Sequence, residues 1–397
     1  EKHGENSKEV KNAEKRIESY KQKIAQLETS IETTTNQMEA MNRRINETSK
    51  HLNGLKWHNL SDGLKTISNG FQNVSNATGK MADLIMPLST TIAGGFAFSA
   101  KTAMDFETAM TQVGVTSQAT AEEMEQLKEV AIQLGEELPI SSTDAAEGLN
   151  YLALAGYDVS EQLIAIEPIA KASVAWTSDL ATVSDLATDS LSAMNLGVEN
   201  LAGYMDMLAN AQSNSNTTAL ALMEAYIEVG GSLAQLNVPL EESMTLLGVM
   251  ANRGVKGAEA GRALSAVLIN LTAGTAKSVG ALEELNIQTF DAQGNFVGLE
   301  NILLQLNEAL AGLTEEQKNN YLAAIGGKQH VSDLNAILAG LNEEYGDLKL
   351  TISDSTGVLD EMTDKMGSTT AMTIEELKGK LESLAIKIGD KLLPFIE

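Results

Sequence analysis

Histidines are the first residues of this chain that could take part in chemistry. They are His3, His51, His58 and His330. His51 and His58 lie seven residues apart, about two helical turns, which is too far for one tetrahedral metal ion. None is accompanied by a second imidazole or by a carboxylate at metal-ligand spacing. We therefore interpret the histidines as exposed polar residues and expect no metal and no cofactor.

Paired carboxylates are the second candidates, and they fall where helices are expected to begin or end. They are Glu122–Glu123, Glu136–Glu137 and Glu241–Glu242. The helix dipole favours acidic side chains in a first turn, so these positions need no catalytic explanation. The chain also lacks a nucleophile elbow and a Walker loop. These observations together argue against an enzyme.

A glycine-rich stretch with basic residues superficially resembles a phosphate-binding loop. It runs from Gly254 to Arg262 and follows Arg253. A phosphate loop has a buried strand before it and a Ser or Thr after its Lys, whereas neither accompanies Lys256. We interpret the stretch as a helix that ends at Gly254, followed by a helix whose small residues allow close packing.

Charge is distributed unevenly along the 397 residues. The net charge is −26, yet residues 1–80 hold 13 Lys and Arg against 10 Asp and Glu, while the remainder holds 15 against 44. An acidic body repels nucleic acid at long range, and no basic surface with interleaved aromatic residues is evident. We expect no sequence-specific nucleic-acid binding. The lack of cysteine excludes disulfides and thiolate metal sites.

The heptad pattern of residues 1–57 predicts a coiled coil. Apolar residues recur every seven positions from Val10 to Leu52, with a weaker series three residues after each. The predicted core positions, where copies would associate, are Val10, Ile17, Ile24, Leu27, Ile31, Met38, Met41, Ile45, Leu52 and Leu55. One helix cannot bury this stripe alone, so it needs sister copies or an antiparallel partner in the same chain. No matching stretch follows, which favours oligomerisation, while two and three strands both remain open.

Residues 58–104 predict a helical linker that changes from amphipathic to apolar. The stretch from Leu84 to Ala100 carries no charge over 17 residues but contains Pro87 and two glycines. Because a membrane span needs about 20 mostly apolar residues, we favour a buried or interfacial helix and keep membrane insertion as the alternative. The residues that would enter a membrane are Leu84, Ile85, Met86, Ile92, Phe96 and Phe98.

The region 105–355 predicts a series of short helices separated by glycines. Thr120 and Glu123 are spaced as a capping box at the start of one of them. Other starts are expected at Ser142 or Thr143 and at Ser160, and ends at Gly135, Gly156, Gly197, Gly230–Gly231, Gly254, Gly274 and Gly312. The pattern is typical of a multi-helix domain.

One short β-hairpin and a C-terminal helix complete the predicted fold. Residues 287–297 alternate in polarity around a turn at Asp291–Asn295, as in a hairpin. Thr373 and Glu376 are spaced as a second capping box before a last apolar stripe.

The predicted fold class is therefore all-α apart from that hairpin. Four regions are expected: a coiled coil at 1–57, a linker at 58–104, a helical domain at 105–355 and a C-terminal helix at 356–397. The chain begins at Glu1 without an initiator Met and ends at Glu397, just after a helical pattern. We therefore expect a piece of a longer polypeptide, with further sequence beyond the last helix.

Seven short segments of the helical region carry a resemblance to a known family. They are Thr102–Met110, Thr120–Lys128, Leu149–Tyr157, Ser213–Thr217, Gly254–Gly261, Phe290–Asn295 and Ile325–Lys328. In this order they resemble the core region of phage tail tape measure proteins, also called phage minor tail proteins. Each segment alone is weak evidence for this resemblance, but the order of all seven over roughly residues 102–340 is specific to the family.

The resemblance implies a structural protein of the virion. Tape measure proteins lie in the lumen of the growing tail tube or at its tip, set tail length by their own length, and leave ahead of the DNA. A homo-oligomer is implied, with a trimer favoured. The partners implied are tail tube proteins, tail tip or baseplate proteins, tail assembly chaperones and, transiently, the host membrane. Assembly takes place in the host cytoplasm, and relatives occur in phage-tail-like bacteriocins.

Two other classes of function provide alternatives to this interpretation. A membrane-perturbing or pore-forming protein would insert residues 84–100, and leakage of liposomes would favour it. An enzyme would need acidic residues gathered in a cleft, and loss of an activity on a single carboxylate substitution would favour that. A ruler, in contrast, needs a contour length proportional to residue number, and a helix supplies about 1.5 Å per residue.

Overall fold

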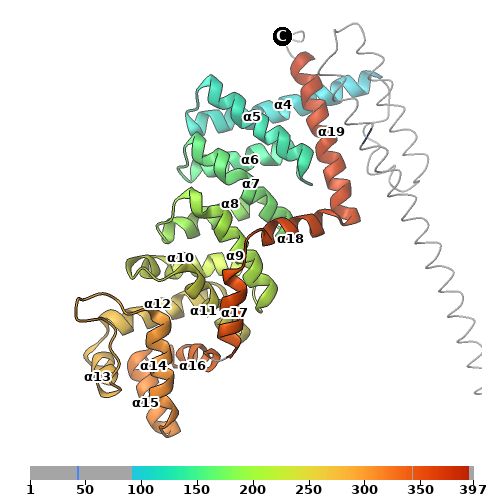
Figure 1. Cartoon of the computed structure of the whole chain (residues 1–397). Coiled ribbons are helices and arrows are strands. Elements are labelled where there is room, and N and C mark those ends of the chain that lie inside the picture. Colours follow the sequence, from blue (N-terminus) through green and yellow to red (C-terminus); the bar gives the residue numbers. More distant parts are fainter. Residues whose placement is uncertain (1–42, 44–91, 342, 393–397) are drawn as a thin grey trace, which may run out of the picture. The chain divides into compact units, whose positions relative to one another are not determined.

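The computed structural model describes Arg43, residues 92–341 and residues 343–392. Figure 1 draws the described residues as a coloured ribbon with labelled helices. These residues belong to two units, one comprising 92–105 with 380–392 and the other Phe106–Gly379. The unit boundaries fall inside two helices, so each unit is treated by itself. The predicted coiled-coil core lies outside the described residues, as do Leu84, Ile85 and Met86 of the apolar stretch. Ile92, Phe96 and Phe98 lie in the first described helix.

The described part of the chain is helical, which confirms the predicted fold class. Its α-helices are α4 (Ile92–Ser117), α5 (Ala121–Glu137), α6 (Ser142–Leu154), α7 (Val159–Trp176), α8 (Leu180–Ala193), α9 (Leu201–Asn214), α10 (Ala219–Gln235), α11 (Leu240–Asn252), α12 (Gly257–Ala273), α13 (Ala276–Glu284), α14 (Leu299–Ala311), α15 (Glu315–Ile325), α16 (Val331–Gly340), α17 (Glu343–Ser353), α18 (Val358–Gly367) and α19 (Thr370–Leu392). A short 3-10 helix, η3 (Val198–Asn200), precedes α9.

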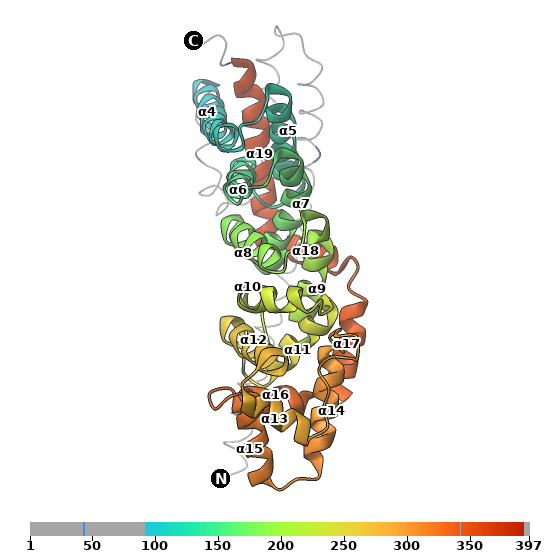
Figure 2. The ribbon, with the colours of Figure 1, turned by 90° about the vertical axis from the view of Figure 1, so that its left-hand side faces the viewer.

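Helices α5 to α12 form two rows within the unit Phe106–Gly379 (Figure 2). In one row α6, α8, α10 and α12 each pack on the next, and in the other α5, α7, α9 and α11 do the same. Each successive pair thus buries its apolar faces on the pair before it, the packing principle of helical solenoids. Helices α13 to α16 follow, and α16 packs on both α11 and α12.

Close contacts between α10 and α12 fix how these two neighbouring helices of one row lie. Arg262 binds Glu228 at 2.8 Å, and the hydroxyls of Ser232 and Ser265 lie 3.1 Å apart. From the first contact to the second, the residue number increases on both α10 and α12, so the two helices run parallel. A Cβ at Gly261 would collide with the backbone carbonyl of Ala225. The predicted close packing of the helix after Gly254 is therefore confirmed, without a phosphate-loop strand.

A single type of turn ends many of these helices. The backbone N–H of the residue after a left-handed residue donates back to the carbonyl five residues earlier, as in the Schellman motif. These bonds join Ala119 to Gly114, Tyr157 to Leu152, Ser178 to Ser173, Leu196 to Leu191, Val238 to Leu233, Val255 to Met250 and Ile287 to Leu282. The left-handed residues are Gln118, Gly156, Thr177, Asn195, Asn237, Gly254 and Asn286. In most of these turns the next residue but one is already the N-cap of the following helix, which makes the connections short and uniform.

Acidic side chains begin several helices. The predicted capping box of Thr120 and Glu123 is present, and Asp158 and Asp179 cap α7 and α8 through their carboxylates. Hydrogen bonds from these helix starts lower the pKa of Glu123, Asp158 and Asp179 below their usual ranges. Some of the acidic residues that give the chain its negative charge therefore stabilise the N-termini of helices.

Some predicted helix boundaries are correct and others are wrong. Helices end as predicted at Gly156, Gly254, Gly274 and Gly312. Gly135 does not end its helix, because α5 continues to Glu137 and stops at Leu138, whose extended conformation is imposed by the following proline. Gly230 and Gly231 lie inside α10, where Gly230 gives room to the end of α8.

Two further boundaries differ in position from the prediction. Helix α7 starts after Asp158 and not at Ser160, because the Asp158 carboxylate accepts from the Glu161 N–H at 2.9 Å. Thr373 does not cap α19, since it lies inside the helix, and the hydroxyl of Thr369 accepts from Met372 at 3.4 Å. Both errors have one cause: a cap-forming residue stood two to four positions earlier in the sequence.

The predicted β-hairpin is wrong as a pair of strands. Residues Asp291 to Asn295 do turn, because the Asp291 carboxylate accepts from the N–H groups of Gln293 and Asn295. Beyond the turn, the described chain holds a single isolated bridge between Phe290 and Phe296. A two-stranded ribbon without a third strand buries too little apolar surface to be stable, so the pairing does not extend beyond this bridge.

Candidate functional site at the returning C-terminal segment

The most elaborate polar site of the unit Phe106–Gly379 forms where the chain returns over its earlier helices. Helices α17 and α18, together with the residues that connect them, are called the return segment (343–367). Helix α17 packs on α9 and α11, whereas α18 packs on α7 and α9. The hydrogen bonds from α7 and α9 join residues more than 140 positions apart in the sequence, and those from the end of α11 join residues 91 and 92 positions apart. They therefore decide the tertiary arrangement and do not follow from local structure.

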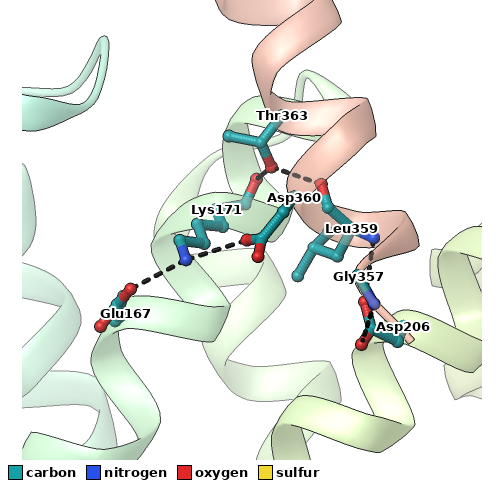
Figure 3. Close-up of polar contacts among 7 residues, drawn as sticks. All are labelled: Glu167, Lys171, Asp206, Gly357, Leu359, Asp360 and Thr363. Atoms are coloured by element: carbon teal, nitrogen blue, oxygen red, sulfur yellow. Dashed lines mark hydrogen bonds and ion pairs between the residues drawn. The ribbon is translucent and has the colours of Figure 1, made fainter.

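Asp206 on α9 provides the start of α18 (Figure 3). One carboxylate oxygen accepts from the backbone N–H of Gly357 at 3.0 Å and the other from Leu359 at 2.9 Å. Gly357, at φ +77°, precedes α18 and has no capping side chain of its own. A negative charge at a helix N-terminus is favourable. Asp206 thus replaces the missing local cap from another helix.

Lys171 on α7 holds the next turn of α18 (Figure 3). Its ammonium group binds Asp360 at 2.9 Å and Glu167 at 2.8 Å. Partial burial lowers the pKa of Lys171, but the hydrogen bonds to these two carboxylates outweigh it and raise that pKa overall. The buried hydroxyl of Thr363 lies 3.1 Å from the backbone carbonyl of Lys171. One residue of α7 therefore contacts α18 through both its side chain and its main chain.

Asn210, one turn after Asp206 on α9, binds the end of α17. Its buried amide donates to the carbonyl of Thr351 at 2.7 Å and lies 3.1 Å from the hydroxyl of Ser355. The side-chain oxygen of Asn210 accepts from Asn214 at 2.8 Å. Carbonyls at a helix C-terminus lack partners within their helix, and Asn210 supplies one. Asp206 and Asn210 together fix both sides of the α17–α18 connection.

The start of α17 is held by the end of α11. Arg253 binds Glu344 at 2.8 Å and donates to the carbonyl of Ala339 at 3.0 Å. Asn252 donates to the other oxygen of Glu344, also at 2.8 Å. The hydrogen bond from Arg253 is the main cause that lowers the pKa of Glu344. Arg253, noted for its place beside a loop-like glycine stretch, therefore serves in a tertiary ion pair.

A half-buried charged cluster lies beside the middle of α17. Glu242 on α11 accepts from the backbone N–H of Glu300 at 2.6 Å, and Lys349 on α17 pairs with the Glu300 carboxylate. Burial raises the pKa of Glu242 and of the neighbouring Tyr345. Glu242 acts as a first-turn residue of α11 and also as a cap for α14. Glu242 of the acidic pair Glu241–Glu242 thus has a structural role that its position in the sequence does not reveal.

His330 and Arg262 take up structural contacts, whereas His3, His51 and His58 lie outside the described residues. His330 lies 2.8 Å from Asp333 one turn along α16. Arg262 is bound to Glu228, as described above. No group of metal-binding residues is found among the described residues, and none of the helices described there is long and apolar enough to cross a membrane. The polar contacts of the return segment therefore hold helices in place, as in a structural scaffold.

Comparison with known proteins assigns the chain to a family. The model of the family described as phage-related minor tail protein matches residues 128–327, just over half of the chain. The chain belongs to the phage-related minor tail protein family. No solved structure gives a significant match.

Two curated relatives of this chain have informative names. The tape measure protein of Pneumococcus phage Dp-1 is 31% identical over 317 residues, which cover 80% of this chain and 28% of the relative. A probable tape measure protein of Escherichia phage P2 is 25% identical over 255 residues, covering 64% of this chain and 30% of the relative. The chain thus spans less than a third of the length of either relative.

The residues matched by the family model include only one of the two sides of the site. Lys171, Asp206, Asn210 and Arg253 lie inside the matched residues 128–327, whereas the return segment follows them. The segments that carried the resemblance in the sequence mostly lie at helix ends, for example Leu149–Tyr157 and Gly254–Gly261. Those helix ends are recognisable in the sequence. The roles of Asp206 and Asn210 are not, because a polar residue inside an amphipathic helix gives no sign of a distant partner.

Proposed function

We propose that this chain is part of a phage tail tape measure protein, a structural component that sets tail length and assists tail assembly and genome ejection. The similarity of 317 residues to a tape measure protein is the observation that carries this proposal. The heptad pattern of residues 1–57 supports it, because a continuous helix gives a contour length proportional to residue number. Membership in a tail protein family favours this role over the membrane-perturbing alternative and over an enzyme.

The partners and location follow from the same proposal. The protein would lie in the phage tail, in the tube lumen or at the tip, after assembly in the host cytoplasm. Its partners would be tail tube and tail tip or baseplate proteins, tail assembly chaperones and, transiently, the host membrane. The heptad residues of the predicted coiled coil would join copies of the chain, with a trimer favoured.

Interruption of the gene in the parent phage tests the structural role. We expect peptides of this chain in purified tails, and we expect a stop codon within its coding sequence to prevent the formation of normal tails. A plasmid copy of the full gene should restore them. Tails of normal number and length without the protein would contradict the proposal.

A further inference from the structure

Of the two helices in the return segment, α18 has fewer buried apolar side chains than α17. Only Leu359 and Thr363 of its 10 residues are buried. Helix α17, in contrast, buries the larger set Tyr345, Leu348 and Ile352. Burial of apolar surface supplies most of the free energy that keeps a helix docked. The two halves of the return segment therefore differ in how firmly they are held.

The rest of the attachment of α18 comes from the half-buried side chains of Val358, Met362 and Met366 and from polar contacts with α7 and α9. The polar contacts are the two hydrogen bonds to Asp206, the ion pair of Lys171 with Asp360, the contact of Thr363 with the Lys171 carbonyl, and a weak bond of 3.9 Å from the Gln212 amide to the Met362 sulfur. The Asp360 side chain is 62% exposed, so solvent weakens that ion pair. An isolated helix of this length is not stable in water. Without docking, α18 loses its helical structure as well as its position.

The connection before α18 allows such a release. Gly357 holds a left-handed conformation at φ +77°, and a Cβ there would touch nothing within 4 Å. Asn210 binds Thr351 and Ser355, just before this glycine, and so keeps α17 anchored up to that point. A hinge therefore lies directly after the last firm contact.

We propose that α18 is a latch that releases from α7 and α9 as one unit while α17 stays docked. As a helix its 10 residues span about 15 Å, and when extended they span up to about 35 Å. Release gives the chain between α17 and α19 about 20 Å of additional reach without unfolding the helix rows. This inference goes beyond the proposed tail function and does not depend on it.

Thiol labelling in the 397-residue chain tests the latch. The natural sequence contains no cysteine, so one introduced thiol reports on one position. Leu359→Cys on α18 and Ile352→Cys on α17 place thiols at sites that are 4% and 1% exposed. Under native conditions we expect the thiol at position 359 to react with a disulfide reagent at least ten-fold faster than that at position 352.

Removal of the Asp206 carboxylate provides the second arm of the test. Asp206→Ala should accelerate labelling at position 359 at least five-fold and leave labelling at position 352 unchanged. Asp189→Ala, an exposed aspartate on α8, is the matched control and should change neither rate. Equal labelling rates at both positions, or equal acceleration of both by Asp206→Ala, would show that α18 opens only with the rest of the unit and would overturn the proposal.

Amide hydrogen exchange of the unsubstituted chain makes the test independent of any cysteine variant. The amides of residues 358–367 should exchange as a group, at least ten-fold faster than the most protected amides of residues 343–353. Protection of both helices by the same factor would overturn the latch even if a variant failed to fold.

Discussion

Adjacent glycines in α10 show how one position can decide the packing of two helices. A Cβ at Gly230 would lie 2.8 Å from the backbone carbonyl carbon of Ala193, whereas a Cβ at Gly231 would meet nothing within 4 Å. In sequence the two glycines are indistinguishable and together suggested a helix end. The structure separates them, because only one faces the end of α8.

Alanine substitutions at this pair test the contact. Gly230→Ala should lower the free energy of unfolding by about 1–3 kcal/mol, because α8 must move to admit the methyl group. Gly231→Ala should raise it by about 0.5–1 kcal/mol, since alanine has the better helix propensity at an open position. Urea unfolding followed by circular dichroism measures both. Equal effects of the two substitutions would contradict the close approach of α8 and α10.

The left-handed turn residues also show a limit of sequence analysis at the residue scale. Glycine marks the turns at Gly156 and Gly254, and both helix ends were predicted. Asparagine occupies the same conformation at Asn195, Asn237 and Asn286, and these ends were missed or misplaced. Asparagine tolerates left-handed backbone but is also common elsewhere, so its presence alone carries little information.

The attachment of α17 to α11 gives a pH-dependent prediction at the scale of the element. The pKa of Glu344 is lowered in the folded chain by Arg253, from an ordinary value of 4.5. An acidic group whose pKa is lower in the folded state than in the unfolded state stabilises the folded state at pH values above the unfolded-state pKa. This stabilisation is lost as the pH falls through the folded-state pKa.

Glu344→Gln should therefore destabilise the unit at neutral pH by about 1 kcal/mol or less, because the pair is partly exposed. The difference from the natural chain should shrink as the pH is lowered below 4.5. Glu308→Gln, at an exposed glutamate on α14, should have little effect at either pH. Urea unfolding at pH 7 and pH 3.5 measures these differences, and a Glu344→Gln effect that grows at low pH would contradict the ion pair.

The predicted coiled coil can be tested with matched sets of substitutions. Serine at three core positions removes the apolar stripe, whereas serine at three outward positions of the same heptads leaves it intact. The core set is Ile17, Ile24 and Ile31, and the outward set is Lys15, Gln22 and Thr29. Sedimentation velocity should show a trimer for the natural chain and the outward set, and a monomer for the core set. A natural chain that sediments as a monomer would contradict this prediction.

Helix existence was largely predictable from the sequence, because apolar periodicity and capping residues are local signals. The capping box at Thr120 and the hydrophobic faces after it were read directly. The stacking of α6 on α8 and of α8 on α10 was not, since the same apolar faces could pack in many orders. The failed hairpin at 287–297 shows that local alternation without a third strand is insufficient.

The arrangement of the unit Phe106–Gly379 as a whole depends on contacts that span much of the chain. Asp206 and Asn210 contact residues 141–153 positions later, and the ends of α17 and α18 rely on them. No periodicity or spacing encodes such pairs, so the return segment could not be predicted. Family resemblance, in contrast, was recognisable because it lies in the order of short local segments.

At the scale of the whole molecule, the central claim is that residue number sets tail length. The direct measurement is the mean tail length, by electron microscopy, of phages whose gene carries in-frame deletions of whole heptads. Removal of residues 17–44, four heptads of the predicted coiled coil, should shorten tails by about 42 Å at ~1.5 Å per residue, and removal of two heptads by half as much. Assembled tails of unchanged length in both deletions would contradict the claim.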